Sequence, residues 1–89
     1  MVSEVKELRR RMHPDVTWIG FPGAGVTPIC RSKEEASARF ATLIAAAPQA
    51  EILEESDDRI VVRMDSDLHQ VLTLRDGLVW LIEDYPERP

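Results

Sequence analysis

A histidine and an aspartate near the end of the chain are the residues best suited to chemistry. They lie in HQVLTLRDGLVWLIEDY, residues 69–85, where apolar and polar residues alternate on both sides of an Asp-Gly pair. Asp-Gly between such runs predicts a two-residue hairpin loop, because both central residues need positive φ. With residues 76–77 in that loop, simple pairing places His69 opposite Asp84. An imidazole beside a carboxylate can transfer protons, so these two residues are the predicted catalytic pair.

Apolar side chains surround this pair in the predicted sheet. Successive residues of a strand point to opposite faces, so the register decides which residues share the face of the pair. The preceding strand, RIVVRMD at residues 59–65, joins the same face through a turn at residues 66–67, and both turns favour one register. The residues predicted to line a ligand pocket on this face are Trp18, Phe40, Val62, Met64, Val71, Trp80 and Ile82.

Each of these features also has a structural interpretation. His69 and Asp84 lie at strand ends, where a solvated cross-strand pair contributes only about 0.2–1 kcal/mol. The indoles of Trp18 and Trp80 offer a stacking surface for a flat ligand, or they simply fill the core. The sequence therefore leaves open whether this face binds a ligand or is packed by its own side chains.

Local signals predict the elements that position these residues. A short helix over residues 3–12, a strand over residues 15–21 and a loop rich in Gly and Pro come first. The main helix follows over residues 32–47, with Ser32 and Glu35 as a capping box, and a four-stranded antiparallel meander completes the chain. This order predicts an α+β fold in which a cone-like, curved antiparallel sheet wraps around the long helix.

The opposite face of the predicted sheet is also apolar. One long helix cannot cover both faces, so a second copy of the chain is expected to cover the other. The sequence therefore predicts a homodimer through the back of the sheet. The residues expected in that interface are Val61, Leu72, Leu74, Val79 and Leu81.

The composition limits the classes of partner. The 89 residues (1–89) make a single domain, and the net charge of −5 argues against a nucleic-acid partner, since phosphate binding needs a basic face. Cys30 is the only cysteine and is interpreted as a packing residue rather than a nucleophile. No metal-ligand spacing is present, and neither a metal nor a cofactor is predicted. No run resembles a membrane span or a signal peptide, so no membrane partner and a cytoplasmic location are expected.

Three segments occur in a characteristic order: MHPDVTWIG, PICRSKEEASARFATLIAAAP and RDGLVWLIEDY. Together they resemble the nuclear-transport-factor-2-like superfamily, in particular its SnoaL-like (polyketide cyclase-like) branch. The resemblance covers residues 12–88. It implies a cone-shaped, cystatin-like fold with an apolar pocket between the sheet and the helices, and it agrees with a homodimer through the sheet.

The chain departs from that family in two places. Only residues 1–12 precede His13, so the long first helix, which roofs the pocket in the family, is expected to be absent, shortened or supplied by another chain. The carboxylate base of ketosteroid-isomerase-like members would fall at Gly20, which argues against steroid isomerase chemistry. Their second acid would fall near Gln70, which the predicted hairpin places on the outer face.

Two functions follow from this reading. In the first, the protein binds a small apolar or polyketide-like molecule, with acid/base isomerase, cyclase or dehydratase activity as an extension that His69 and Asp84 would carry. In the second, it is a non-enzymatic dimerisation or binding module whose concave face receives a partner. The catalytic pair favours the first function, and the shortened N-terminus favours the second.

Overall fold

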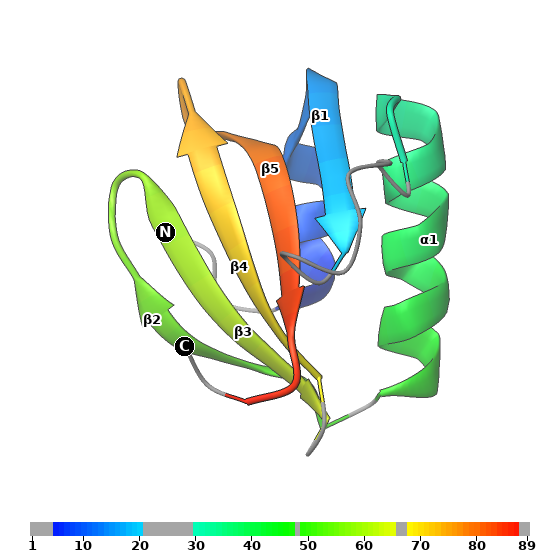
Figure 1. Cartoon of the computed structure of the whole chain (residues 1–89), viewed down its shortest axis with the longest axis vertical. Coiled ribbons are helices and arrows are strands. Elements are labelled where there is room, and N and C mark those ends of the chain that lie inside the picture. Colours follow the sequence, from blue (N-terminus) through cyan, green and yellow to red (C-terminus); the bar gives the residue numbers. More distant parts are fainter. Residues whose placement is uncertain (1–4, 21–29, 48, 66–67, 88–89) are drawn as a thin grey trace.

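Five strands form one curved sheet, and the long helix lies beside its first strand. The computed structural model describes residues 5–20, 30–47, 49–65 and 68–87. In chain order, its elements are η1 (Val5–Arg11), β1 (Met12–Gly20), α1 (Lys33–Ala46), β2 (Glu51–Glu55), β3 (Arg59–Asp65), β4 (Leu68–Arg75) and β5 (Leu78–Tyr85), as shown in Figure 1.

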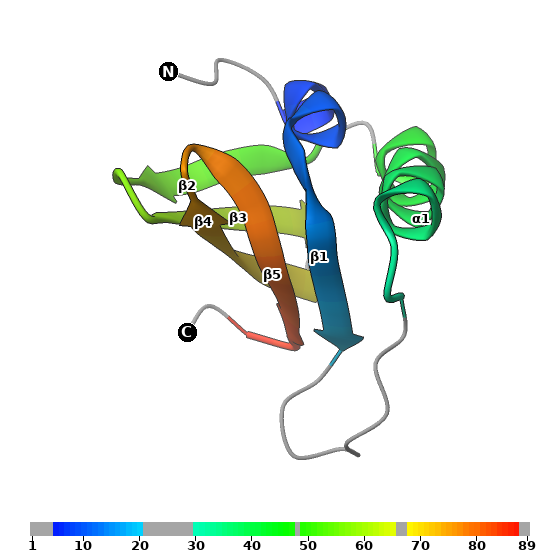
Figure 2. The ribbon, with the colours of Figure 1, turned by 90° about the horizontal axis from the view of Figure 1, so that it is seen from above.

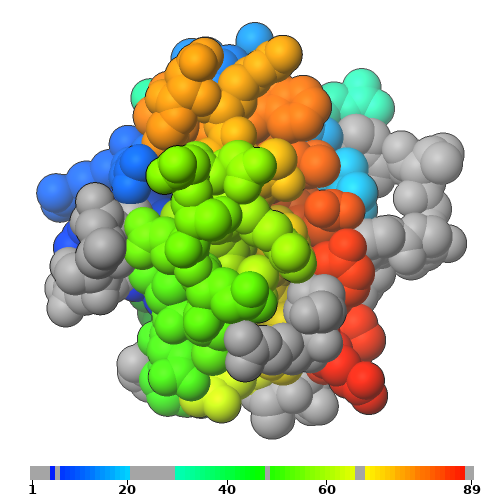
Figure 3. Space-filling view, turned by 90° about the vertical axis from the view of Figure 1, so that its left-hand side faces the viewer, coloured from blue at the N-terminus to red at the C-terminus, as the bar shows by residue number. Residues whose placement is uncertain are grey.

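The strand order in the sheet is β1-β5-β4-β3-β2. Strands β2 to β5 form the predicted antiparallel meander, and the predicted α+β fold with a curved sheet is confirmed. The sheet is mixed rather than wholly antiparallel, because β1 pairs with β5 in the parallel sense. Seen from above, it curls from β1 round to β2 (Figure 2), and β2 lies at the surface along the far edge (Figure 3).

Helix α1 begins and ends where local signals place it. The backbone N–H of Glu35 donates to Ser32 Oγ at 3.1 Å, so Ser32 caps the helix as predicted. The buried side chains of Ala36 and Phe40 face β1 and η1, against which the helix packs (Figure 2). None of the helices that the structure describes is long and apolar enough to cross a membrane.

The N-terminal part differs from the sequence prediction. The short helix is a 3₁₀ helix that ends at Arg11, and β1 already begins at Met12, so the strand includes Pro14. Proline cannot donate to a strand ladder, but β1 is an edge strand, where this is tolerated.

The hairpin between β4 and β5 has the predicted loop but not the predicted register. Asp76 and Gly77 both adopt positive φ (55° and 78°), as a two-residue loop requires. Arg75 pairs with Leu78, but the register shifts just beyond, so Trp80 has no partner residue in β4. From this β-bulge onward, each residue of β4 pairs with the β5 residue one position after its predicted partner.

A second bulge lies between β3 and β4. Arg63 pairs with His69, and Asp65 pairs with Leu68, so Met64 is the extra residue. Because of the two bulges, the side chains of β4 point to the faces opposite to those predicted. The side chains of β3 and of the end of β5 point to the predicted faces. The prediction that His69 and Val71 share a face with Asp84 is therefore wrong.

The core lies between the inner face of the sheet, α1 and η1. It includes five residues of the predicted pocket wall, namely Trp18, Phe40, Val62, Met64 and Ile82. Trp80 is not among them, because the bulge turns it outward and its side chain is 36% exposed.

The apolar set predicted for the back of the sheet is largely inside. Leu72 and Val79 are fully buried core residues, and Leu74 packs against that core. The homodimer stays a prediction, but the reason drawn from these three residues no longer supports it.

Two leucines test this register, because the simple hairpin puts both on the outer face. In the structure Leu72 is fully buried, whereas Leu81 is half-buried on the outer side. We expect Leu72→Ala to lower the free energy of unfolding by about 2–5 kcal/mol. Leu81→Ala should cost about 1–2 kcal/mol, since part of its side chain is already in water. Urea denaturation measures both, and an equal or larger loss for Leu81→Ala would contradict the bulged register.

Candidate functional site

A buried carboxylate joins three neighbouring strands. Asp84 on β5 is only 5% exposed. Both of its oxygens accept from Trp18 Nε1 of β1, each at 3.1 Å, and Oδ1 also accepts from Gln70 Nε2 of β4 at 2.9 Å. We call Asp84, Gln70 and Trp18 the carboxylate cluster. It is a polar site within an otherwise apolar core.

Gln70 is the member that the sequence analysis placed on the wrong face. Gln70 pairs directly with Asp84 and is fully buried, and its Oε1 atom has no hydrogen-bond partner among the described residues. A signal for this facing exists within β4 itself. Alternate residues of a strand point to the same face, so Gln70 shares its face with Leu68, Leu72 and Leu74. The opposite face of β4 includes one histidine and one threonine and is therefore less apolar. The more apolar set of side chains faces the core.

An aromatic and basic layer covers the cluster on the side of α1. The rings of Trp18 and Phe40 meet edge to face, with centroids 6.3 Å apart. The guanidinium carbon of Arg39 lies 5.3 Å from the Trp18 ring centroid. Cys30 forms an isolated bridge with Trp18 through two backbone hydrogen bonds, of 3.0 and 3.3 Å. Of the predicted ligand-binding residues, Trp18 therefore contacts Asp84 directly, and Phe40 packs against Trp18.

The predicted catalytic pair is not formed. His69 lies opposite Tyr85, one residue away from the position that would face Asp84. Neighbouring strand residues point to opposite sides of the sheet, so the imidazole is outside and the carboxylate inside. His69 is 8% exposed, and within residues 5–20, 30–47, 49–65 and 68–87 its Nδ1 atom has no hydrogen-bond partner.

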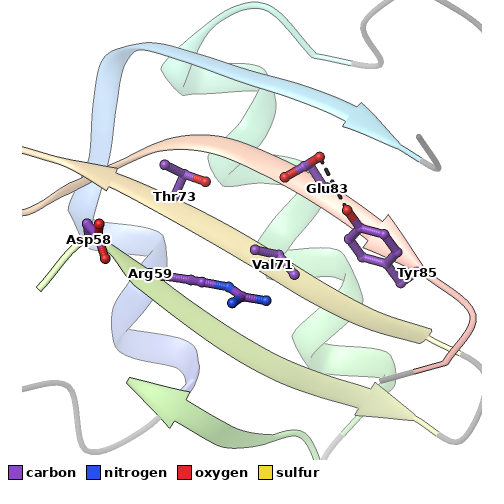
Figure 4. A pocket seen from close by; sticks show the side chains of 6 residues that line it. All are labelled: Asp58, Arg59, Val71, Thr73, Glu83 and Tyr85. Carbon is purple, nitrogen blue, oxygen red and sulfur yellow. Dashed lines mark hydrogen bonds between the residues drawn. The ribbon is translucent and has the colours of Figure 1, made fainter. Parts of the chain in front are cut away.

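The outer face of the sheet carries a separate hollow, with a volume of about 330 Å³. Val71, a residue of the predicted inner wall, lies here instead (Figure 4). Tyr85 Oη donates to Glu83 Oε2 at 3.4 Å. Burial raises the pKa of Tyr85, the charge and hydrogen bond of Glu83 raise it further, and Arg59 partly opposes both. The lining residues are Asp58, Arg59, Val71, Thr73, Glu83 and Tyr85.

Two further hollows lie at the surface. One, of about 350 Å³, is lined by Ala38, Arg39, Thr42 and Leu43 of α1. The other, of about 460 Å³, adjoins the β4–β5 loop, where Arg11 Nη2 donates to the Gly77 carbonyl oxygen at 2.8 Å. Asp84 lines none of these three hollows. Within the described ranges, no group of three or more His, Cys, Asp or Glu side chains is arranged to hold a metal ion.

The sequence matches no family model and no curated protein. Solved structures do share the fold. A cystatin-fold protein from Novosphingobium aromaticivorans has a TM-score of 0.54 at 14% identity, with 91% of this chain and 86% of that chain covered. An NTF-2-like protein from Burkholderia xenovorans has a TM-score of 0.57 at 13% identity, covering 98% and 75%.

A third structure bears on the branch that the sequence resembles. A putative SnoaL-like polyketide cyclase from Jannaschia has a TM-score of 0.50 at 18% identity, with 90% of this chain and 70% of that chain covered. Identities this low establish the architecture alone. The resemblance read from the sequence is therefore confirmed at the level of the fold, which is that of the nuclear-transport-factor-2-like and cystatin-like proteins.

Proposed function

We propose that this protein binds a small, mostly apolar molecule and holds a hydrogen-bond donor of that molecule against the carboxylate cluster. One observation carries the proposal: the fully buried Gln70 Oε1 receives no hydrogen bond from any residue in the part of the chain that the structure describes. Buried polar atoms are nearly always paired, so an exception among the described residues calls for a further hydrogen-bond donor, which a ligand can supply.

The amide of Gln70 cannot be turned round to remove this exception. Its Nε2 lies 2.9 Å from Asp84 Oδ1. The opposite orientation would place a carbonyl oxygen against a carboxylate oxygen, and the two would repel. Leaving Oε1 without a donor costs about 1–3 kcal/mol, which the hydroxyl or amine of a ligand would recover.

The surroundings favour a ligand that is otherwise apolar. Trp18 and Phe40 present aromatic surface next to the cluster, and Met64 and Ile82 belong to the same core. Small-molecule sites commonly combine such walls with a few polar groups that orient the ligand. Trp18 and Phe40 are fully buried, so binding requires side chains of α1 to move away from β1.

Acid/base catalysis is an extension of this proposal. Asp84 would accept or donate the proton, with Gln70 and Trp18 orienting its carboxylate. His69 takes no part, because it lies on the other side of the sheet. The chemistry to test is isomerase, cyclase or dehydratase activity, and the name of the Jannaschia protein, a putative SnoaL-like polyketide cyclase, favours the cyclase among these.

The alternative is a non-enzymatic binding or dimerisation module. A partner on the concave side would meet the packed side chains of Trp18 and Phe40, so the outer face suits a partner better. The outer hollow brings both Arg59 and Glu83 to one surface. A twofold axis places the same surface on both copies, which lets the arginine of each face the glutamate of the other.

The neutral fluorescent probe N-phenyl-1-naphthylamine tests the proposal, because it has an apolar aromatic body and one N–H donor. We expect saturable binding to the wild-type protein. Gln70→Leu should weaken it by about fivefold, the value of one hydrogen bond near 1 kcal/mol. Gln49→Leu, at an exposed position, is the matched control. An unbound probe, or equal affinity for the Gln70→Leu variant, would refute the proposed site.

Removing the carboxylate measures what the cluster contributes to stability. Asp84→Ala leaves Trp18 Nε1 and Gln70 Nε2 buried without an acceptor. We expect the free energy of unfolding to fall by about 1–3 kcal/mol. Asp15→Ala, which removes an exposed carboxylate from β1, should leave it nearly unchanged. Equal stability of the two variants in urea would show that the cluster does not hold the strands together.

The thiol of Cys30 is not suited to act as a nucleophile. Burial raises its pKa above the usual 9.0; Arg39 lowers it in part, and Glu35 and Asp84 raise it. The thiolate is therefore rarer in the folded than in the unfolded chain, and stability associated with this group is lost as the pH rises from about 9 through the folded pKa.

Thiol titration checks this, because Cys30 is the only cysteine. We expect Ellman's reagent at pH 8 to react at least about tenfold more slowly with the folded protein than in guanidinium chloride. The rate for the folded protein should keep rising beyond pH 9. A midpoint below pH 9 would mean that the thiol is activated.

A further inference from the structure

We infer that the ligand carries an anionic group and that Arg39, which lies over the Trp18 ring, binds it. This inference rests on the proposed function and names the ligand class. The proposed function requires a hydrogen-bond donor on the ligand. This inference also requires a negative charge on the part of the ligand nearest α1.

One indole connects the two polar positions. The Nε1 atom of Trp18 donates to Asp84, and the guanidinium of Arg39 lies over the same ring, 5.3 Å from its centroid. A ligand that reaches the carboxylate cluster beside this indole would therefore lie close to the cation that covers one face of the ring. The ring itself provides apolar surface.

Arg39 is available to an anion. Its side chain is exposed and lines the hollow of about 350 Å³ beside α1. A guanidinium stacked on an indole keeps its N–H edge free, and that edge matches a carboxylate or sulfonate with two parallel hydrogen bonds.

The neighbouring charges allow such a site but limit its strength. Glu35 lies one helical turn before Arg39, and both act on the thiol of Cys30, so a ligand anion would also meet this carboxylate. The Glu35 carboxylate is directed in part toward Ser32, whose Oγ lies 3.5 Å from Oε1. The chain as a whole carries a net charge of −5, so an anion gains attraction here only from a local cation.

The chain contains an internal control for this geometry. Arg75 also stacks on an indole, 5.1 Å from the centroid of Trp80, but this pair lies beside the β4–β5 loop on the outside of the sheet. A general preference of anions for arginine–tryptophan pairs would involve both sites. Recognition by the proposed site would involve Arg39 alone.

Two probes that differ by one charge test the inference. N-phenyl-1-naphthylamine is neutral, and 8-anilinonaphthalene-1-sulfonate has the same two ring systems and N–H with an added sulfonate. For the wild-type protein in low salt we expect the anionic probe to bind about five- to tenfold more tightly than the neutral one. Arg39→Gln should bring the ratio of the two affinities close to one, and Arg75→Gln should leave the ratio as in the wild type.

The outcomes separate the two claims. If the neutral probe binds through Gln70 but the ratio is the same in the wild type and Arg39→Gln, this inference fails and the proposed function stands. If Arg75→Gln lowers the ratio as much as Arg39→Gln, the sulfonate follows exposed stacked arginines, and the inference fails as well. Near-UV circular dichroism shows whether the wild-type protein is folded. If it is folded and binds neither probe, both the proposed function and this inference fail.

Discussion

The carboxylate of Asp84 has to be satisfied inside the protein, and the arrangement of the sheet depends on this. A carboxylate that is 5% exposed is costly unless donors surround it. Trp18 from β1 and Gln70 from β4 supply those donors, so β5 is tied to the strand on each side of it. These bonds join the one parallel pair of the sheet to the antiparallel meander. A slip of β4 by one residue would remove Gln70 from the core.

The two bulges make this arrangement possible. The bulge at Trp80 shifts the β4–β5 register, and the bulge at Met64 shifts the β3–β4 register, so only the strand between them changes face. Bulges also increase the local twist and bend of a strand, which suits a sheet that curls from β1 round to β2 (Figure 2). As a result, the inner face receives Gln70 and Leu72, and the outer face receives His69 and Val71.

The chemistry of the molecule is divided between these two faces. The inner face combines the carboxylate cluster with aromatic walls, and Arg39 reaches it from α1 across the Trp18 ring. The outer face has both signs of charge around the hollow near Tyr85 (Figure 4). In the proposed function a small ligand is held at the inner site, where the few polar atoms are already oriented. In the proposed alternative a partner covers the outer hollow, where Arg59 of β3 and Glu83 of β5 bring opposite charges to one surface.

Signals carried by neighbouring residues were sufficient for much of the fold. The Ser32 cap, the loop at Asp76 and Gly77 and the four-stranded meander each depend on local backbone preferences, and the sequence alone predicted them. The inward facing of Trp18, Ile82 and Asp84 was also predicted correctly. The even-numbered residues of β4 are more apolar than the odd-numbered ones, and this difference also indicated which of its side chains face the core.

Only the tertiary structure decided the pairing of β1 with β5, the two bulges and the partner of Asp84. A bulge depends on how a curved sheet fits around α1 and η1, and residues far apart in the chain determine that fit. The simple register satisfied both turns yet placed His69 beside Asp84. The folded chain instead placed Gln70 there, because the fourth strand buries its more apolar side and a buried carboxylate needs donors from both neighbouring strands.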